Sequence, residues 1–429
     1  MGEGRIWPGS RQRFRLTTAG CCLIIPCTER KEMSSKTQNI LICGGGNGAH
    51  VLAGILSSRE NTQTNVLTLY KDEAEMWNKS LEHGMMCCMF PNESEISARP
   101  NMISKNPADV VPGANLILIT VPAFSHENYL KAIEPYICSP ATIVGLPGQP
   151  GFEFQSRDIL KAKSQFVSVL SATTLPWACR IVEYGRKVKI NGIKKTVDVA
   201  VIKDTSRGTI NPLLHLQSVL GSPPALNKIN HFLEVSLMFT SIHPGLMYGR
   251  WKHWDGIPLS EEPLFYQGTD DFQAKCVTDL DDEVQLITKE ISKRTGIHFQ
   301  GCLSMYEWFI KSYGSAISNP SSLKTVLVTN KAYEGMVHPM KKVKGGYVPD
   351  FQHRYLSEDV PFGLVVVKGM AKIVGLKTPV IDEVIRWGQQ KLGKVYIEGT
   401  ELTGEHLCET RAPQVYGIKT LKDLHTMMI

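Results

Sequence analysis

The sequence has no long hydrophobic run. Its longest apolar stretches, Leu116–Val121 and Val365–Val367, fall far short of the ~20 residues that a membrane-spanning helix needs. Stretches of this length are typical of buried strands or of segments within core helices. We therefore expect no membrane as a partner.

Sequence patterns for disulfides and zinc are also missing. The 11 cysteines are odd in number, and the adjacent pairs Cys21-Cys22 and Cys87-Cys88 do not resemble a disulfide framework. No pair separated by two residues is matched by a second such pair, as a zinc site would require. We expect reduced thiols, no metal ion and a cytoplasmic location.

Charge is present but is not concentrated. The 47 basic and 41 acidic residues give a net charge of +6, spread along the chain without runs. This distribution argues against nucleic acid as a partner and is compatible with small anionic ligands. A chain of 429 residues is too long for one ordinary core and predicts two domains of roughly 200 residues each.

Residues 1–36 differ from the rest of the chain. Four arginines between residues 5 and 15 stand against Glu3, the single acid before residue 29. A transit peptide is one interpretation, because such peptides are basic and poor in acid. The other is an upstream extension before a natural start at Met33. We favour the extension and expect residues 1–36 to be disordered.

From residue 39 onward, short apolar strands alternate with helical stretches. The expected strands are Ile40–Cys43, Val66–Tyr70, Leu116–Val121, Ala141–Gly145 and Phe166–Leu170, with helices through Ala53–Leu56 and over Asp72–Lys79. Alternation of this kind predicts a parallel sheet with right-handed crossovers and helices on both faces. We place this α/β domain, a Rossmann domain, at residues 37–230.

The pattern changes to helical periodicity after about residue 230. The expected helices are Ile229–Thr240, Asp281–Thr295, Leu303–Tyr313, Pro361–Ile373 and Ile381–Leu392. The dipeptide Pro223-Pro224, after Gly221-Ser222, predicts a linker near residues 220–235. Residues 231–429 are therefore predicted to form an all-helical domain.

The segment Gly44-Gly45-Gly46-Asn47-Gly48-Ala49 has the residue types that a bound pyrophosphate demands. Gly44 permits a tight turn after the strand, Gly46 lets the backbone approach the phosphates, and Ala49 lets the helix pack on the sheet. The helix N-terminus then offers N–H groups and a partial positive charge to the anion. This glycine loop predicts a dinucleotide cofactor.

One element of the dinucleotide pattern departs from the rule. An Asp or Glu about 20 residues after the loop normally binds the ribose hydroxyls. Here the second strand ends Leu69-Tyr70-Lys71, and Asp72 comes slightly late. Lys71 either favours a 2′-phosphate or is a solvated lysine, so the loop leaves NADH and NADPH open.

Two further segments lie where the sheet's carboxyl edge should meet the cofactor. Val121 and Pro122 end the third strand, and the glycines around Gln149 would allow close approach of the nicotinamide ring. The alternative interpretation is that Pro122 only terminates the strand and that Val121-Pro122 has no part in cofactor binding.

Hydride chemistry on a carbonyl or imine needs a proton donor, a partner that orients it, and a cation for the substrate carboxylate. Histidine, a carboxylate and arginine suit these three tasks. His243, Asp359 and Arg354 are candidates in the helical half. His338-Pro339 repeats the His243-Pro244 dipeptide, so the residues alone do not choose between the two histidines.

Several short motifs follow one another in order from about Asn39 to Ile418. They are Ile42–His50, Thr120–Phe124, Leu175–Arg180, His243-Pro244, Gly249–Trp251, Trp254–Gly256, Pro263–Gly268 and Arg354–Pro361. Together they resemble the octopine dehydrogenase group of invertebrate opine dehydrogenases, whose relatives act on tauropine, alanopine or strombine. The resemblance covers nearly the whole chain except its first 35 or so residues.

The resemblance implies a Rossmann domain followed by an all-helical opine dehydrogenase domain, with the active site in the cleft between them. Such enzymes condense an amino acid or amine with pyruvate and reduce the imine with NADH, regenerating NAD in anaerobic glycolysis. A monomer is also implied. NADH is favoured over NADPH by the resemblance, not by the loop.

The resemblance also implies roles for individual residues. The catalytic histidine falls on His243, its acidic partner on Asp359 and the keto-acid-binding arginine on Arg354. Trp308 falls on an aromatic wall of the substrate site. Gln149 and Thr174 fall on polar lining positions.

One departure from the octopine-forming relative concerns the amine substrate. That relative has an acidic residue before Thr-Leu-Pro-Trp, whereas this chain has Thr173. A bound guanidinium needs a carboxylate to offset its desolvation, so we expect a small or neutral amine such as alanine, glycine or taurine. Two alternatives stay open: a glycerol-3-phosphate or 2-hydroxyacid dehydrogenase of the same layout, and an NADH-binding sensor without turnover.

Overall fold

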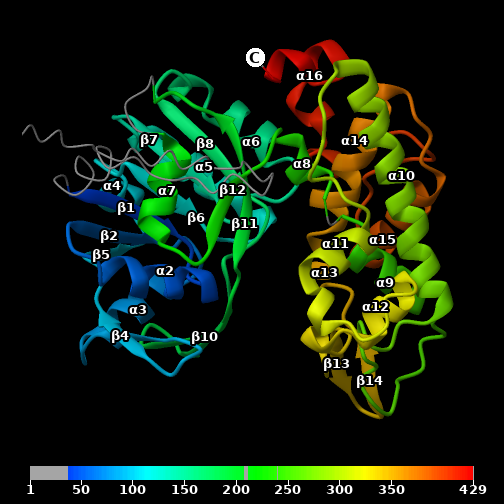
Figure 1. The fold of residues 1–429 in the computed structure, drawn as a ribbon, viewed down its shortest axis with the longest axis horizontal. Coiled ribbons are helices and arrows are strands. Elements are labelled where there is room, and N and C mark those ends of the chain that lie inside the picture. Colours follow the sequence, from blue (N-terminus) through cyan, green and yellow to red (C-terminus); the bar gives the residue numbers. More distant parts are fainter. Residues whose placement is uncertain (1–36, 207–210, 239, 429) are drawn as a thin grey trace, which may run out of the picture.

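The computed structural model describes residues 37–206, 211–238 and 240–428. The predicted extension over residues 1–36 lies outside this part of the chain. Figure 1 shows a strand-rich half, coloured blue to green, beside a helix-rich half that ends in red.

The strand-rich half is built on a mixed eight-stranded sheet. In spatial order the strands are β12 (Ala225–Lys228), β11 (Thr196–Lys203), β8 (Val167–Ala172), β7 (Ala141–Gly145), β6 (Leu116–Ile119), β1 (Gln38–Cys43), β2 (Thr62–Leu67) and β5 (Met102–Ser104). All neighbouring pairs are parallel except β8 and β11. The predicted parallel sheet is confirmed for six strands, while β11 and β12 run antiparallel to them at one edge.

Helices cover both faces of this sheet, as the alternation of side chains along β1 requires. Ile40 and Ile42 point into one core and Leu41 and Cys43 into another, because successive strand residues face opposite sides. The helices of this half are α2 (Asn47–Ser57), α3 (Glu73–Leu81), α4 (Pro107–Val110), α5 (Ala123–Ile133), α6 (Phe152–Ile159) and α7 (Pro212–Leu220). Residues of α2 and α7 belong to the first core, and residues of α5 belong to the second.

A second sheet was not predicted from the sequence. Its four strands, in spatial order, are β4 (Glu95–Ala98), β3 (Met86–Met89), β10 (Lys187–Ile193) and β9 (Trp177–Glu183). Burial alternates along β10, with Val188 and Ile190 buried and Lys189 exposed. This sheet packs its buried side chains into the same core as α2.

The other half is helical, as predicted, around the 25-residue helix α10. Its elements are α8 (Leu233–Ser236), α9 (Ile242–Trp251), α10 (Asp271–Thr295), α11 (Met305–Tyr313), α12 (Leu323–Thr329), α13 (Arg354–Ser357), a π-helical turn (Val360–Leu364), α14 (Val365–Val374), α15 (Pro379–Leu392) and α16 (Leu421–Met428). Asp270 starts α10 with a capping box and Gly296 ends it in the left-handed conformation.

Three expectations for this half need correction. The predicted helix Ile229–Thr240 is wrong in extent, because only Leu233–Ser236 is helical. The predicted linker near residues 220–235 contains the paired strand β12. The half also carries a two-stranded hairpin, β13 (Met340–Val343) and β14 (Gly346–Pro349), so it is helical with one addition.

Polar contacts join the two halves. The guanidinium of Arg411, from the C-terminal segment, is fully buried and donates to the carbonyls of Gly148, Pro150 and Ala123. The hydroxyl of Ser236 on α8 accepts from the N–H of Gly151 at 2.8 Å. The carboxyl edge of the sheet is thus attached to the helical half.

Within the described residues, no helix has both the length and the apolar character that crossing a bilayer requires. Every cysteine described there is a free thiol.

Candidate active site

The glycine loop lies between β1 and α2 at the carboxyl edge of the sheet. Gly44 has a φ of +129°, and a Cβ there would lie 2.9 Å from the carbonyl oxygen of Thr120 and 2.8 Å from Val121. The first turn of α2 begins at Gly46 without a side-chain cap. These are the features of a dinucleotide cradle: a close backbone approach and a helix N-terminus free to meet an anion.

The predicted cofactor segments meet at this edge. β6 ends at Ile119, so Val121 packs directly against the glycine loop and Pro122 caps the start of α5. Parallel strands bring these segments together because their carboxyl ends share one edge.

His50, one turn into α2, fixes the loop from within the protein. Its Nε2 accepts from the N–H of Gly185 at 2.9 Å, so Nδ1 carries the proton and donates to the carbonyl of Gly46 at 3.0 Å. The ring stacks on Trp77 with centroids 3.9 Å apart. Burial lowers the pKa of His50 to about 4, so the imidazole stays neutral.

The proposed catalytic histidine lies at the start of α9 and is bonded at both ring nitrogens. Nδ1 of His243 is 2.6 Å from Oδ2 of Asp359, and Nε2 is 2.9 Å from the hydroxyl of Tyr266. Tyr355 stacks on the imidazole with ring centroids 4.0 Å apart. The sequence prediction that His243 and Asp359 act together therefore has direct geometric support, whereas His338 contacts Trp251 in the buried interior.

The contacts of His243 define its neutral tautomer. The Asp359 carboxylate accepts from Nδ1–H, which leaves the Nε2 lone pair to accept from Tyr266. Burial raises the pKa of Tyr266 well above its usual value, so the phenol keeps its proton. Nε2 is the nitrogen available for proton exchange.

Arg354 opens α13 and is tied to a buried carboxylate. Its Nε lies 2.9 Å from Oε2 of Glu358, while Oε1 of Glu358 accepts from the N–H of Ala123 at 2.7 Å. Burial raises the pKa of Glu358, and the Arg354 charge opposes that rise. Glu358 therefore connects the arginine to the first turn of α5, beside Pro122.

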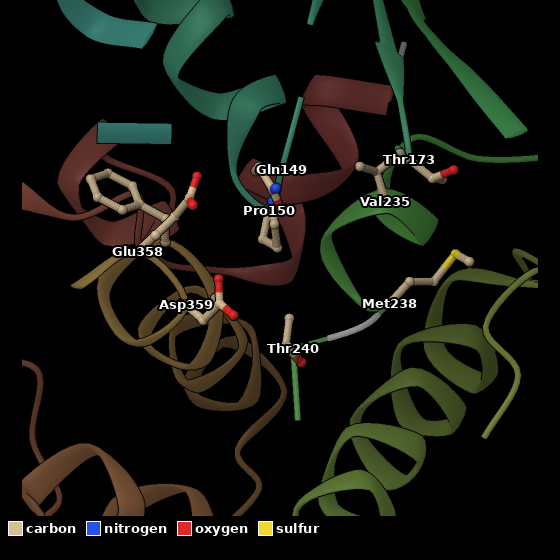
Figure 2. A pocket seen from close by; sticks show the side chains of 10 residues that line it. Gln149, Pro150, Thr173, Val235, Met238, Thr240, Glu358 and Asp359 are labelled. Carbon is tan, nitrogen blue, oxygen red and sulfur yellow. The ribbon is translucent and has the colours of Figure 1, made fainter. Parts of the chain in front are cut away.

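A cavity of about 30 Å³ lies between the two halves. Gln149 and Thr173 line it from the sheet edge, and Asp359 lines it from the helical half. In Figure 2 the Asp359 carboxylate lies between Pro150 and Thr240. One predicted substrate residue, Gln149, is thus brought to the same cavity as Asp359, together with Thr173, the neighbour of the predicted Thr174.

The other two predicted lining residues lie elsewhere. Thr174 follows Thr173, and its hydroxyl accepts from Lys194 at 3.1 Å. Trp308 lies on α11 and packs against Phe309 and Tyr313.

Gln149 is held in an uncommon backbone conformation. Its φ is +64°, in the left-handed region that non-glycine residues seldom adopt. Arg411 binds the carbonyls on both sides of it, those of Gly148 and Pro150. Arg411 therefore stabilises the loop that presents Gln149 to the cavity.

Sequence reasoning missed Tyr266, Glu358 and Arg411. Tyr266 lies within the motif Pro263–Gly268, but nothing in that motif indicates that its hydroxyl reaches His243. Glu358 follows Arg354 by four residues, a spacing that on a helix usually marks an exposed ion pair. Arg411 had no local signal.

Comparisons with known proteins identify the family. A family model described as the alpha-helical domain of NAD/NADP octopine/nopaline dehydrogenase matches residues 228–392. The opine dehydrogenase of Haliotis discus hannai is 45% identical over 405 residues, covering 92% of this chain and 100% of the relative. The chain belongs to the octopine dehydrogenase family.

Two further relatives extend the comparison. The tauropine dehydrogenase of Arabella iricolor is 40% identical and covers 90% of this chain and 99% of its own. A solved octopine dehydrogenase with NADH and L-arginine is 43% identical, has a TM-score of 0.86, and covers 90% of this chain and 98% of its own. The family consists of NAD-dependent oxidoreductases that act on CH–NH donors, so the expected fold class, enzyme class and cofactor are confirmed.

Proposed function

We propose that the protein condenses pyruvate with a small or neutral amino acid or amine, such as alanine, glycine or taurine, and reduces the product with NADH. The observation that carries this proposal is the cavity that joins Asp359 to Gln149 and Thr173, next to the His243–Asp359 pair. An amine condensing with the pyruvate carbonyl releases one water and gives an imine. One hydride at the imine carbon and one proton at nitrogen then give the opine.

The chain's own residues bind, orient and exchange protons. His243 serves as general acid and base through Nε2, and Asp359 stabilises the imidazolium that forms when His243 holds the proton. Arg354 binds the pyruvate carboxylate in a two-point contact, oriented by Glu358. Val121 and Pro122 at the sheet edge would help to hold NADH, which would supply the hydride.

Gln149, Thr174 and Trp308 complete the substrate site in this proposal. The cavity of about 30 Å³ is too small for pyruvate and an amine together, so we propose that the substrates enter while the two halves are apart and that closure of the halves excludes bulk water. Exclusion of bulk water protects an imine, which water would otherwise hydrolyse.

The amine preference rests on Thr173. This residue lines the cavity, and its hydroxyl donates to the carbonyl of Asp198 at 3.2 Å. Because a threonine hydroxyl is neutral, Thr173 brings no negative charge to the cavity. The two carboxylates that line the same cavity, Asp359 and Glu358, are already paired with His243 and Arg354, so a guanidinium bound beside Thr173 would lose its hydration without a free carboxylate to replace it. Small or uncharged amines avoid this penalty.

A panel of amines tests the preference. Pyruvate-dependent NADH oxidation is measured with alanine, glycine, taurine and arginine, and we expect kcat/KM for arginine to be the lowest. Pyruvate without amine serves as the control, because oxidation in its presence would indicate a 2-hydroxyacid dehydrogenase instead. Arginine as the best substrate would overturn the amine assignment.

A charged substitution at the same position sharpens the test. Thr173→Glu should raise kcat/KM for arginine roughly tenfold or more, because a charge-assisted hydrogen bond to the guanidinium contributes about 1.5–3 kcal/mol. Thr173→Gln has the same length without the charge and is the matched control. An equal gain in both variants would assign the effect to size.

We further propose a monomer that works in the cytoplasm, with the division into residues 37–230 and 231–429 separating cofactor binding from substrate chemistry. Size-exclusion chromatography with light scattering tests the first point, and separate expression of the two segments tests the division.

A further inference from the structure

The structure supplies an acidic residue near the glycine loop that the sequence pattern did not place. β2 ends at Leu67, and the following Tyr70 and Lys71 are exposed. Lys71 has a φ of +44°, so the chain turns sharply there. The position that usually carries the ribose-binding acid is therefore occupied by neither an Asp nor a Glu.

Glu73, in the first turn of α3, reaches back over the loop instead. Its Oε2 accepts a hydrogen bond from the hydroxyl of Thr68. A Cβ placed on Gly45 would overlap that same oxygen, so the carboxylate lies directly above the loop's backbone. Any larger residue at position 45 would push the Glu73 carboxylate out of this position.

A second polar group faces the same point. A Cβ on Gly45 would lie 2.9 Å from the hydroxyl of Tyr184, which is buried and has no hydrogen-bond partner among the described residues. Burial raises the pKa of Tyr184, and the charge of Glu73 raises it further, so the phenol remains a donor. An unpaired buried donor beside a carboxylate indicates a place prepared for a polar ligand.

We infer that Glu73 binds the adenosine ribose hydroxyls of the cofactor and excludes a 2′-phosphate, with Tyr184 completing the contact. The pyrophosphate belongs at the N-terminus of α2, and the space above Gly45 borders it on the β2 side, where a Rossmann domain holds the adenosine ribose. A carboxylate accepts from two hydroxyl donors but repels a phosphate dianion. This inference rests on the proposed NADH-dependent function.

Two lysines beside this point make the selection sharper. The ammonium group of Lys105 donates to the carbonyl of Lys71, so it lies at the turn that follows β2, where the Lys71 side chain begins. Without Glu73, their positive charges would attract a 2′-phosphate. The carboxylate is therefore the residue that decides between the two cofactors.

The test measures binding and needs no turnover. Dissociation constants of NADH and NADPH are measured by fluorescence titration for the wild-type chain, Glu73→Gln and Glu75→Gln. Glu75 lies in the same turn of α3, carries the same charge and is exposed, so it is the matched control. The amide of Glu73→Gln can still accept from Thr68, which keeps the loop contact.

We expect Glu73→Gln to weaken NADH binding roughly tenfold, to tighten NADPH binding, and to leave the melting temperature near the wild-type value. Adding Lys71→Ala to Glu73→Gln should remove the gain for NADPH. A wild-type NADH/NADPH ratio in Glu73→Gln, or an equal change in Glu75→Gln, would overturn the inference. Because neither pyruvate nor an amine is present, a failed amine assignment leaves this result intact.

Discussion

The candidate functional residues are close together in sequence in one half of the protein and far apart in sequence in the other. In the nucleotide-binding half, the cradle comes from six consecutive residues, Gly44 to Ala49, and from strand ends that a parallel sheet brings to one edge. In the helical half, His243 and Asp359 are 116 residues apart in sequence and meet through the packing of α9 against the segment that follows α13. A binding loop can be encoded locally, whereas the proposed catalytic pair depends on the packing of the whole helical core.

The helical half also completes the other half's site. Arg411 and Glu358 are both buried, and both bind the backbone of the nucleotide-binding half. Buried charged groups are costly unless hydrogen-bonded, so these contacts are retained only where the two halves meet in a defined geometry. The two halves therefore depend on each other for their geometry, and the following experiments test how far cofactor binding and catalysis can be separated by substitution.

The largest expected effect separates chemistry from cofactor binding. His243→Gln removes the proposed general acid and base, so kcat should fall by roughly 10²–10⁴-fold. The glycine loop is not altered, so the dissociation constant of NADH should stay within about twofold of wild type. Steady-state kinetics and NADH fluorescence titration measure the two quantities. Unchanged turnover would refute the assigned role.

The second effect concerns stability in the nucleotide-binding half. Burial holds the pKa of His50 at about 4, below the ordinary 6.5, so the unfolded chain binds a proton in this pH window that the folded chain does not. The neutral His50 therefore makes its full contribution to the free energy of unfolding above pH 6.5. That contribution falls as pH drops toward 4, by on the order of 3 kcal/mol.

Urea unfolding between pH 4 and 7 measures this change. His50→Phe cannot take up the proton, so its stability should depend less on pH than that of wild type. His253 is exposed, and His253→Phe is the control that should keep the wild-type slope. Identical slopes for all three proteins would contradict the neutral, buried state of His50.

The smallest expected effect tests how the helical half orients its base. Tyr266→Phe removes the hydroxyl bonded to Nε2 of His243 and keeps the ring that stacks on Tyr333. We expect kcat to fall about tenfold with little change in KM, because the imidazole loses one of its two fixed contacts. Tyr333→Phe is the matched control and should keep kcat. Equal losses would point to packing as the cause.

Local patterns in the sequence predicted the central strands of the eight-stranded sheet and the glycine loop of the nucleotide-binding half. The strands Ile40–Cys43 and Ala141–Gly145 were recognised because they are short, apolar and bounded by turn residues. The helix predicted over Ile229–Thr240 failed because an apolar stretch with helical spacing also suits a segment buried by its neighbours. The hairpin β13–β14 was missed because its strands, of four residues each, carry little periodicity.

The sequence by itself determined the cofactor loop, the division into a strand-rich and a helix-rich half and, through its resemblance to a family, the pairing of His243 with Asp359. These features follow from neighbours along the chain or from ordered motifs. Only the tertiary structure decided that Tyr266 bonds to His243, that Arg411 holds the Gln149 loop and that Glu73 covers Gly45. Such contacts depend on where distant or turn-separated backbones place their side chains, and hydrogen bonds tolerate errors of only a few tenths of an ångström.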